Sequence, residues 1–180
     1  MLPPFDLVPG VRLRLVRAGD GDALAAAARR NADHLAPWEP IRGADHATPA
    51  RQEAFAADMV AQHAAGTAAA FVIVRDDTII GQATVTHVVR GPFLSANLGY
   101  WLDAHETGRG IMTLAVGAVA EYCRDALGLH RLQAATLVHN DASQAVLARA
   151  GFERIGHAPR YLKIAGSWQD HVLFQRILKR

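Results

Sequence analysis

The segment Leu98–Val116, LGYWLDAHETGRGIMTLAV, limits the fold of this 180-residue chain more than any other. Its pattern predicts a strand, a short loop that contains Gly108 and Gly110, and then a helix. The first backbone N–H groups of a helix lack partners within the helix, and the helix dipole adds partial positive charge there. The segment therefore predicts an anion site, typically for phosphate, and the two glycines let the backbone approach a pyrophosphate closely.

This glycine loop does not match the two best-known phosphate motifs. It lacks the Gly-Lys-Ser/Thr ending of a P-loop and the Gly-x-Gly-x-x-Gly of a dinucleotide-binding fold. A dinucleotide-binding domain would also carry its glycines in the first strand–helix unit, whereas here they lie past the middle of the chain. On its own, a Gly-x-Gly turn is more often structural, so the anion site needs support from the rest of the sequence.

Hydrophobic periodicity predicts alternating strands and helices along the whole chain. The predicted strands are 11–17, 68–75, 78–87, 95–102, 131–138, 152–156 and 171–178. The predicted helices are 23–30, 50–64, 111–127 and 141–150, and a proline-rich loop spans 34–49. A mixed α/β (α+β) sheet with helices on both faces is the economical architecture. Length and the lack of a clear linker predict one domain over residues 1–180.

Composition excludes several classes of protein. Nineteen basic residues nearly balance 17 acidic ones without long runs of either, so no nucleic-acid partner is expected. The chain has a single cysteine, which excludes an internal disulfide, and no clustered Cys/His set that predicts a metal site. With no 18-residue apolar stretch and no signal-peptide pattern, we expect no membrane partner and a cytoplasmic location. The sequence leaves open whether the chain forms a homodimer.

Several further stretches accompany the glycine loop in a fixed order. They are APWEP at 36–40, GYWLD at 99–103, TGRGIMT at 107–113, GLHRLQAATLVHNDAS at 128–143, LARAGFERIG at 147–156 and DHVLF at 170–174. Together they cover nearly the whole chain, which resembles the GNAT N-acetyltransferases, and among them the RimJ/RimL-type ribosomal-protein alanine N-acetyltransferases. The family motif Gln/Arg-x-x-Gly-x-Gly/Ala falls on 107–112, with departures at Thr107 and Met112.

The resemblance implies acetyl-CoA as cosubstrate, no metal, and a GNAT-type sheet. That sheet is mixed, mostly antiparallel and twisted, and it is splayed between the strands at 97–102 and 131–138. The pantetheine arm would lie in the gap and bond to the backbone of Leu98, Tyr100 and Leu102. The pyrophosphate would contact the loop and helix start, which comprise Thr107, Gly108, Arg109, Gly110, Ile111, Met112 and Thr113.

Asn140 and Ser143 are the predicted catalytic side chains of the cosubstrate side. The resemblance implies that Asn140 bonds to the pantetheine amides and that Ser143 gives a proton to the departing thiolate. Asn140 could instead be an ordinary helix N-cap, and both interpretations stay open. Cys123 lies on the apolar stripe of its predicted helix, so a buried inert thiol and direct transfer without an acetyl-enzyme are expected.

The resemblance places the APWEP loop beside the acceptor. Trp38 and Glu39 are then candidates for one wall of the acceptor site and Tyr161 for the other, while Trp168 could line that wall or be packing. An attacking amine must first lose its proton. Many family members use a Glu where this chain has Asn97, so we expect water-mediated deprotonation assisted by Glu39.

The predicted function is acetyl transfer from acetyl-CoA to the N-terminal α-amino group of a protein or peptide, a ribosomal protein above all. An α-amine has a reference pKa of about 8, against about 10.4 for lysine, so more of it is neutral at pH 7. That property suits a site without an evident strong base. Two alternatives remain open: acetylation of a small amine such as an antibiotic or polyamine, and a CoA-binding module without catalysis.

Overall fold

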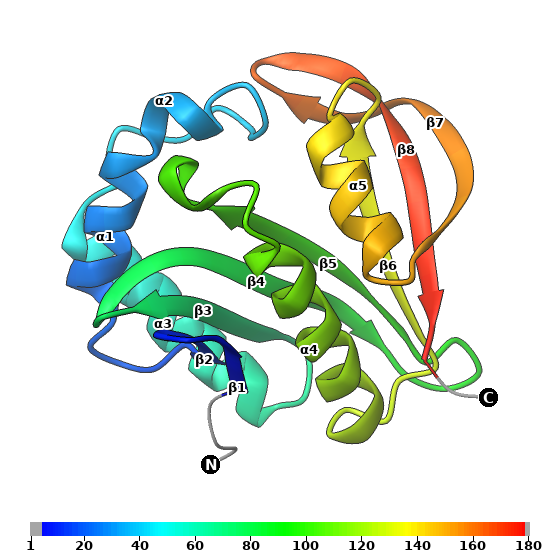
Figure 1. Cartoon of the computed structure of the whole chain (residues 1–180), viewed down its shortest axis with the longest axis horizontal. Coiled ribbons are helices and arrows are strands. Elements are labelled where there is room, and N and C mark those ends of the chain that lie inside the picture. The colour runs from blue at the N-terminus through cyan, green and yellow to red at the C-terminus, as the bar shows by residue number, and fades with distance from the viewer. Residues whose placement is uncertain (1–4, 179–180) are drawn as a thin grey trace.

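The computed structural model describes residues 5–178 and contains an eight-stranded mixed sheet in the order β1-β2-β3-β4-β5-β6-β8-β7 (Figure 1). The strands are β1 Phe5–Val8, β2 Val11–Leu15, β3 Ala69–Arg75, β4 Thr78–Val89, β5 Ser95–Leu102, β6 Arg131–Leu137, β7 Glu153–Ile164 and β8 Ser167–Ile177. The helices are α1 Gly21–Arg30, α2 Ala32–Leu35, α3 Pro49–Ala64, the 3-10 helix η1 Ala104–Glu106, α4 Ile111–Asp125 and α5 Asp141–Arg149.

Local sequence signals account for most of these elements. Thr48 caps α3 by accepting a hydrogen bond from the Arg51 amide, and Pro49 occupies the first turn, where its missing N–H costs nothing. The β3–β4 hairpin turns at Asp76 and Asp77, which both take positive φ angles, a conformation that Asp tolerates in tight hairpins. Six of the seven residues of β3 are buried, because helices cover both faces of the sheet there.

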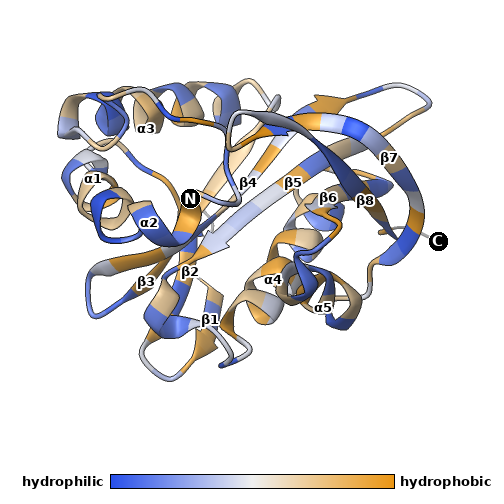
Figure 2. Ribbon diagram, turned by 90° about the horizontal axis from the view of Figure 1, so that it is seen from above, coloured by the Kyte–Doolittle hydropathy of each residue, from blue (hydrophilic) through white to orange (hydrophobic). Residues whose placement is uncertain are grey.

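Helices α1, α2 and α3 lie on one face of the sheet and α4 and α5 on the other (Figure 2). Each face has its own apolar core. The larger core packs α4, including Val116 and Val119, and Leu147 of α5 against residues such as Phe71 and Phe174 of the sheet. The smaller core packs Leu24, Ala56 and Met59 of α1 and α3 against the opposite face. No helix within residues 5–178 is long and apolar enough to cross a membrane.

The sheet opens between its two central strands. β5 and β6 form the parallel pair of the sheet, and their register runs only from Ser95–Arg131 to Asn97–Gln133. Beyond that point β5 stays paired with β4 as far as Leu102, while β6 stays paired with β8 as far as Leu137. The two halves of the sheet therefore diverge and leave a gap (Figure 1), which confirms the predicted mixed, mostly antiparallel, splayed sheet.

Several elements differ from the sequence predictions, among them the 3-10 helix η1, which was not predicted. β1 and the four-residue α2 were not predicted, since one is short and flanked by prolines and the other lies within the expected loop. β7 continues far beyond the predicted 152–156, and β8 begins earlier than the predicted 171. β7 is an edge strand with side chains exposed along almost its whole length, and Pro159 interrupts its pattern. Its sequence therefore lacks the apolar alternation that marks a half-buried strand.

Candidate active site

The glycine loop before α4 has an open backbone surface. Gly108 and Gly110 have φ angles of 77° and 76°, and Gly110 is the left-handed N-cap residue of the helix. No heavy atom lies within 4 Å of the position that a Cβ would take at either glycine. Packing therefore does not explain these glycines. The loop turns in a conformation that other residues disfavour, and it leaves room beside the first amides of α4.

An ion-pair network anchors this loop to the sheet. Glu106 receives two hydrogen bonds from Arg75 of β3, at 2.8 and 3.0 Å, and one from Arg109 at 3.1 Å. Arg109 is thereby held at the rim, with 60% of its side chain exposed. The hydroxyl of Thr107 donates to the Ala104 carbonyl at 2.9 Å, so that side chain is engaged within its own turn.

Asp103, at the end of β5, ties the same loop to α1. Its carboxylate accepts hydrogen bonds from Arg30 and Asn31 of the α1 end and from the amide of His105. Burial acts to raise the pKa of Asp103, but these hydrogen bonds and the Arg30 charge outweigh burial and lower its pKa below the usual value. The loop that follows β5 is thus fixed from two sides.

The remaining residues predicted for the cosubstrate border the gap or the start of α4. Leu98 is buried on β5, whereas Tyr100 and Leu102 are half-buried where that strand leaves β6. Ile111 and Met112 pack into the larger core. Met112 thus fills core volume, which explains how it replaces the small residue of the family motif. Thr113 is half-buried on the first turn of α4.

At the start of α5, Asn140 and Ser143 lie across the gap from β5. Asn140 Oδ1 accepts a hydrogen bond from the Ser143 amide at 3.0 Å, so Asn140 is the N-cap of the helix. The Tyr100 hydroxyl lies 2.8 Å from Ser143 Oγ and donates to the Ser143 carbonyl at 3.1 Å. Burial raises the pKa of Tyr100 to about 12, so its hydroxyl keeps its proton at neutral pH.

Sequence reasoning missed this role of the Tyr100 side chain. It assigned Tyr100 a backbone contact only, because no local pattern links two residues 43 positions apart. The hydroxyl pair joins β5 to α5 and bridges the two walls of the gap.

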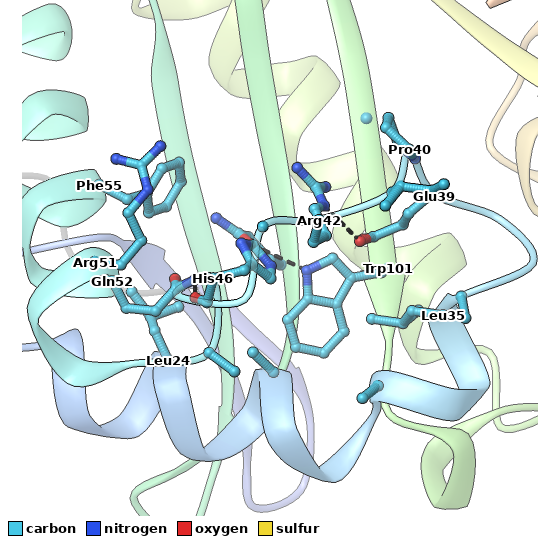
Figure 3. Close-up of a pocket in the computed structure, with 18 of the residues that line it drawn as sticks. Leu24, Leu35, Glu39, Pro40, Arg42, His46, Arg51, Gln52, Phe55 and Trp101 are labelled. Carbon is cyan, nitrogen blue, oxygen red and sulfur yellow. Dashed lines mark hydrogen bonds and ion pairs between the residues drawn. The ribbon is translucent and has the colours of Figure 1, made fainter. Parts of the chain in front are cut away.

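A second cavity, of about 690 Å³, lies on the side of α1, α2 and α3 (Figure 3). Trp101 lies between the loop that carries Arg42 and the helix that carries Leu24, and its indole N–H donates to Gln82 at 3.0 Å. The other apolar lining includes Leu35 and Phe55. Charged and polar lining residues are Glu39, Arg42, His46, Arg51 and Gln52. Burial and nearby Arg42 lower the pKa of His46.

Tyr100 and Gly99 of β5 also line this cavity. Neighbouring side chains of a strand point to opposite faces of the sheet. Trp101 therefore faces the cavity, whereas the Tyr100 side chain packs with the larger core on the other face and reaches Ser143 there.

The residues predicted for the acceptor separate into two groups. Glu39 lines the cavity, pairs with Arg42 at 2.9 Å, and its carbonyl accepts a hydrogen bond from Ala165 in the β7–β8 turn. Trp38 contacts His139 instead, with ring centroids 5.6 Å apart and ring planes tilted by 37°.

Two aromatic residues of the β7–β8 hairpin complete the predicted set. Tyr161 lies 5.6 Å from the ring of His171 and is 45% exposed. Trp168 is 62% exposed, so it is not a core residue. Neither residue is part of the cavity lining.

Two other candidate chemistries find no support in the geometry. Cys123 is fully buried in the larger core, and burial raises its pKa to about 12, which disfavours the reactive thiolate. Within residues 5–178, no group of three or more His, Cys, Asp or Glu side chains is arranged to hold a metal ion.

Comparison with known proteins identifies the family. Residues 11–153 match the acetyltransferase (GNAT) domain. The chain is 38% identical to the [ribosomal protein uS5]-alanine N-acetyltransferase of Escherichia coli K12, over 92% of this chain and 90% of that protein. The structure of the ribosomal-protein-S5-alanine acetyltransferase from Vibrio fischeri matches with a TM-score of 0.95 and 35% identity, over 98% and 97% of the two chains. Mycobacterium smegmatis RimJ, in complex with CoA-disulfide, matches with a TM-score of 0.89 and 35% identity, over 97% and 86%.

A splayed sheet with an open glycine loop at a helix start and a second cavity beside it is the architecture of an acyltransferase. The chain belongs to the GNAT acetyltransferase family. It is an acetyl-CoA-dependent N-acetyltransferase, as the sequence resemblance predicted. The open amides beside Gly110 and the gap beyond Asn97 fit the phosphates and the extended arm of this cosubstrate.

Proposed function

We propose that this enzyme acetylates the N-terminal α-amino group of a ribosomal protein by direct attack of the amine on acetyl-CoA. Relatives named for the alanine N-acetylation of ribosomal protein S5 support this acceptor, because their similarity covers nearly the whole chain. It therefore includes the segments that line the second cavity as well as the glycine loop. The alternatives of a small amine and of a CoA-binding module are not favoured by any of these relatives.

The observation that carries the proposal is the position of Tyr100. The strand β5 borders the cavity at Gly99 and Trp101 on one face, and on the other face the hydroxyl of Tyr100 bonds to Ser143 at the start of α5. An amine in the cavity and a thioester in the gap between β5 and β6 would meet beside this stretch of β5. Close alignment of this kind is what direct attack requires.

On the cosubstrate side, backbone groups do most of the binding. The amides from Gly108 to Thr113 would hold the pyrophosphate, with Arg109 adding charge at the rim. The backbone of Leu98, Tyr100 and Leu102 would bond to the pantetheine arm where β5 has left β6. Asn140 keeps its N-cap bond and would contribute its amide N–H groups to the same arm. Bound acetyl-CoA supplies the thioester that the amine attacks.

On the proton-transfer side, three residues have proposed roles. Ser143 would donate its hydroxyl proton to the departing sulfur and regain a proton from the water that takes up the proton of the amine. Tyr100, which stays protonated at neutral pH, would hold the Ser143 side chain in place. Glu39 would orient the incoming ammonium through the cavity, and water would carry the proton away. Arg42 engages one carboxylate oxygen of Glu39 and keeps that side chain in position.

Two aromatic residues would contact the acceptor beyond its first residue. Trp38 adjoins Glu39, and Tyr161 is partly exposed on the hairpin whose turn bonds to the Glu39 carbonyl. An extended N-terminal segment that leaves the cavity would pass between them. The apolar surface formed by Leu24, Leu35 and Trp101 suits a small first side chain.

A competition assay tests the acceptor. Peptides that begin with Ala, Ser or Met are incubated with acetyl-CoA together with aminoglycosides and polyamines, and products are identified by mass spectrometry. We expect acetylation at the peptide α-amine, with Ala and Ser preferred to Met. Turnover of the small amines alone would overturn the protein-acceptor proposal and leave the family assignment intact.

A further inference from the structure

One buried hydroxyl has no part in the bonding described above. Thr136 of β6 is only 5% exposed, and its Oγ1 is the one buried side-chain oxygen or nitrogen of residues 5–178 without a hydrogen-bond partner. Such groups are rare because an unpaired buried hydroxyl destabilises the fold, and each calls for an explanation. The explanation here lies in where Thr136 stands on the sheet.

Thr136 lies on the part of β6 that no longer pairs with β5. The β5–β6 register ends at Asn97–Gln133, and Thr136 lies three residues beyond that point. Continuing the same register would set Thr136 opposite Tyr100 across the gap. The two hydroxyl-bearing side chains therefore flank the place where the strands separate.

The side chain of Thr136 also points to the face on which Ser143 lies. Alternate residues of a strand share one face, and Leu132 and Ala134 of β6 pack into the larger core beneath α4 and α5. Thr136 shares their face. On β5 the side chains of Leu98 and Tyr100 contact the same core, and Tyr100 reaches Ser143 of α5 from there.

We infer that the Thr136 hydroxyl is a hydrogen-bonding contact for the thioester group of bound acetyl-CoA. The thioester carbonyl accepts a hydrogen bond, the hydroxyl can donate one, and a buried site makes that bond stronger than it would be in water. Thr136 is thus a binding residue that positions the thioester, whereas Ser143, held by Tyr100, protonates the departing sulfur. This inference rests on the proposed binding mode in the gap.

The test replaces Thr136 with Val, which keeps the shape of the side chain and removes the hydroxyl. Calorimetry measures the Kd of acetyl-CoA and of adenosine 3′,5′-bisphosphate, which lacks the pantetheine arm. We expect Thr136→Val to weaken acetyl-CoA binding about threefold to tenfold, the usual effect of one hydrogen bond, and to leave the bisphosphate unchanged. The infrared carbonyl band of carbon-13-labelled acetyl-CoA should move to higher frequency in the variant complex.

Stability gives an independent readout on the ligand-free enzyme. Because the substitution removes an unpaired buried hydroxyl, Thr136→Val should melt at the same or a higher temperature than the wild type. A matched control is Thr86→Val on β4, whose hydroxyl contacts His87 outside the gap, and it should leave acetyl-CoA affinity unchanged.

Three results would overturn the inference: unchanged acetyl-CoA affinity in Thr136→Val, equal weakening of both ligands, or a lower melting temperature, which would reveal a structural partner for the hydroxyl. Failure of the proposed binding mode is distinguishable from these. If the proposed binding mode were wrong, Gly110→Val, which disturbs the amides proposed to hold the pyrophosphate, would also bind acetyl-CoA with wild-type affinity.

Discussion

The proposed cosubstrate side and the proposed acceptor side of the active site use different groups of the chain, backbone amides on one side and side chains on the other. The proposed cosubstrate side consists of backbone amides at one helix start, and partly buried ion pairs to β3 and α1 fix it in place. The proposed acceptor side consists of residues from three helices, a long loop and two strands, and the hairpin turn joins it through the Ala165–Glu39 backbone bond. A fixed backbone site suits a cosubstrate common to the family, whereas a wall of side chains can change with the acceptor.

The largest effect is expected from a change where the two sides meet. Ser143→Ala removes the proposed proton donor to the leaving sulfur, and loss of general acid catalysis typically costs about a hundredfold or more in rate. Steady-state kinetics should show this loss in kcat, while calorimetry shows little change in acetyl-CoA affinity. Wild-type kcat in Ser143→Ala would show that the thiolate leaves without help from α5.

The next effect should fall on the cosubstrate side alone. Gly110→Val places a branched side chain at a φ of 76° and beside the first amides of α4, so acetyl-CoA affinity should fall by about tenfold to a hundredfold. Gly91→Val is the matched control, because Gly91 has a φ of 70° and equally open surroundings but lies far from the loop in sequence. If calorimetry gave both folded variants wild-type affinity, the glycine loop would not be the phosphate site.

The contrast between the two sides also explains what the sequence could predict. The glycine loop is one contiguous segment, and its glycines and helix start follow from local rules. The splayed sheet followed from the family resemblance and is confirmed by the register that stops at Asn97. The cavity of the proposed acceptor side gathers residues from separate elements, so the sequence could indicate Glu39 but not the other lining residues Leu24, Phe55 and Trp101.

Other features were hidden for related reasons. The Tyr100–Ser143 contact depends on how β5 meets α5, which no local pattern encodes. The unpaired state of Thr136 becomes visible only once every neighbouring hydrogen bond is known. β7 lacks the alternation of a half-buried strand because it is an exposed edge.

A smaller effect on kcat is expected from removing the hydroxyl of Tyr100, which lies on the strand between the two proposed sides. Tyr100→Phe keeps the ring packed against the larger core and removes the hydroxyl that holds Ser143, so kcat should fall about threefold to tenfold, as for one lost hydrogen bond. The KM of a peptide acceptor should stay close to that of the wild type. Because the pKa of Tyr100 is raised to about 12, the wild-type and variant pH profiles should have the same shape from about pH 6 to 9.

Two comparisons decide whether Tyr100 acts through Ser143. In the double variant with Ser143→Ala, the additional loss from Tyr100→Phe should largely disappear, since contacting residues that act as a unit are not additive. Fully additive losses would show that Tyr100 acts on the acceptor alone and not on the helix that carries Ser143.

The smallest effect on activity is expected from substitutions of Cys123, which lies in the larger core. Cys123 is fully buried on α4, and its pKa of about 12 leaves it as a neutral thiol throughout the physiological range. Direct transfer needs no such nucleophile, so Cys123→Ala should keep kcat within about twofold of the wild type and lose only about 1 kcal/mol of stability from the small cavity. Cys123→Ser should cost more stability than Cys123→Ala, because it buries a hydroxyl among apolar side chains.

Intact-protein mass spectrometry after incubation with acetyl-CoA alone should find no acetyl group on Cys123. An acetylated Cys123 that passes its acetyl group to a peptide would replace direct attack with a two-step transfer through the core of α4.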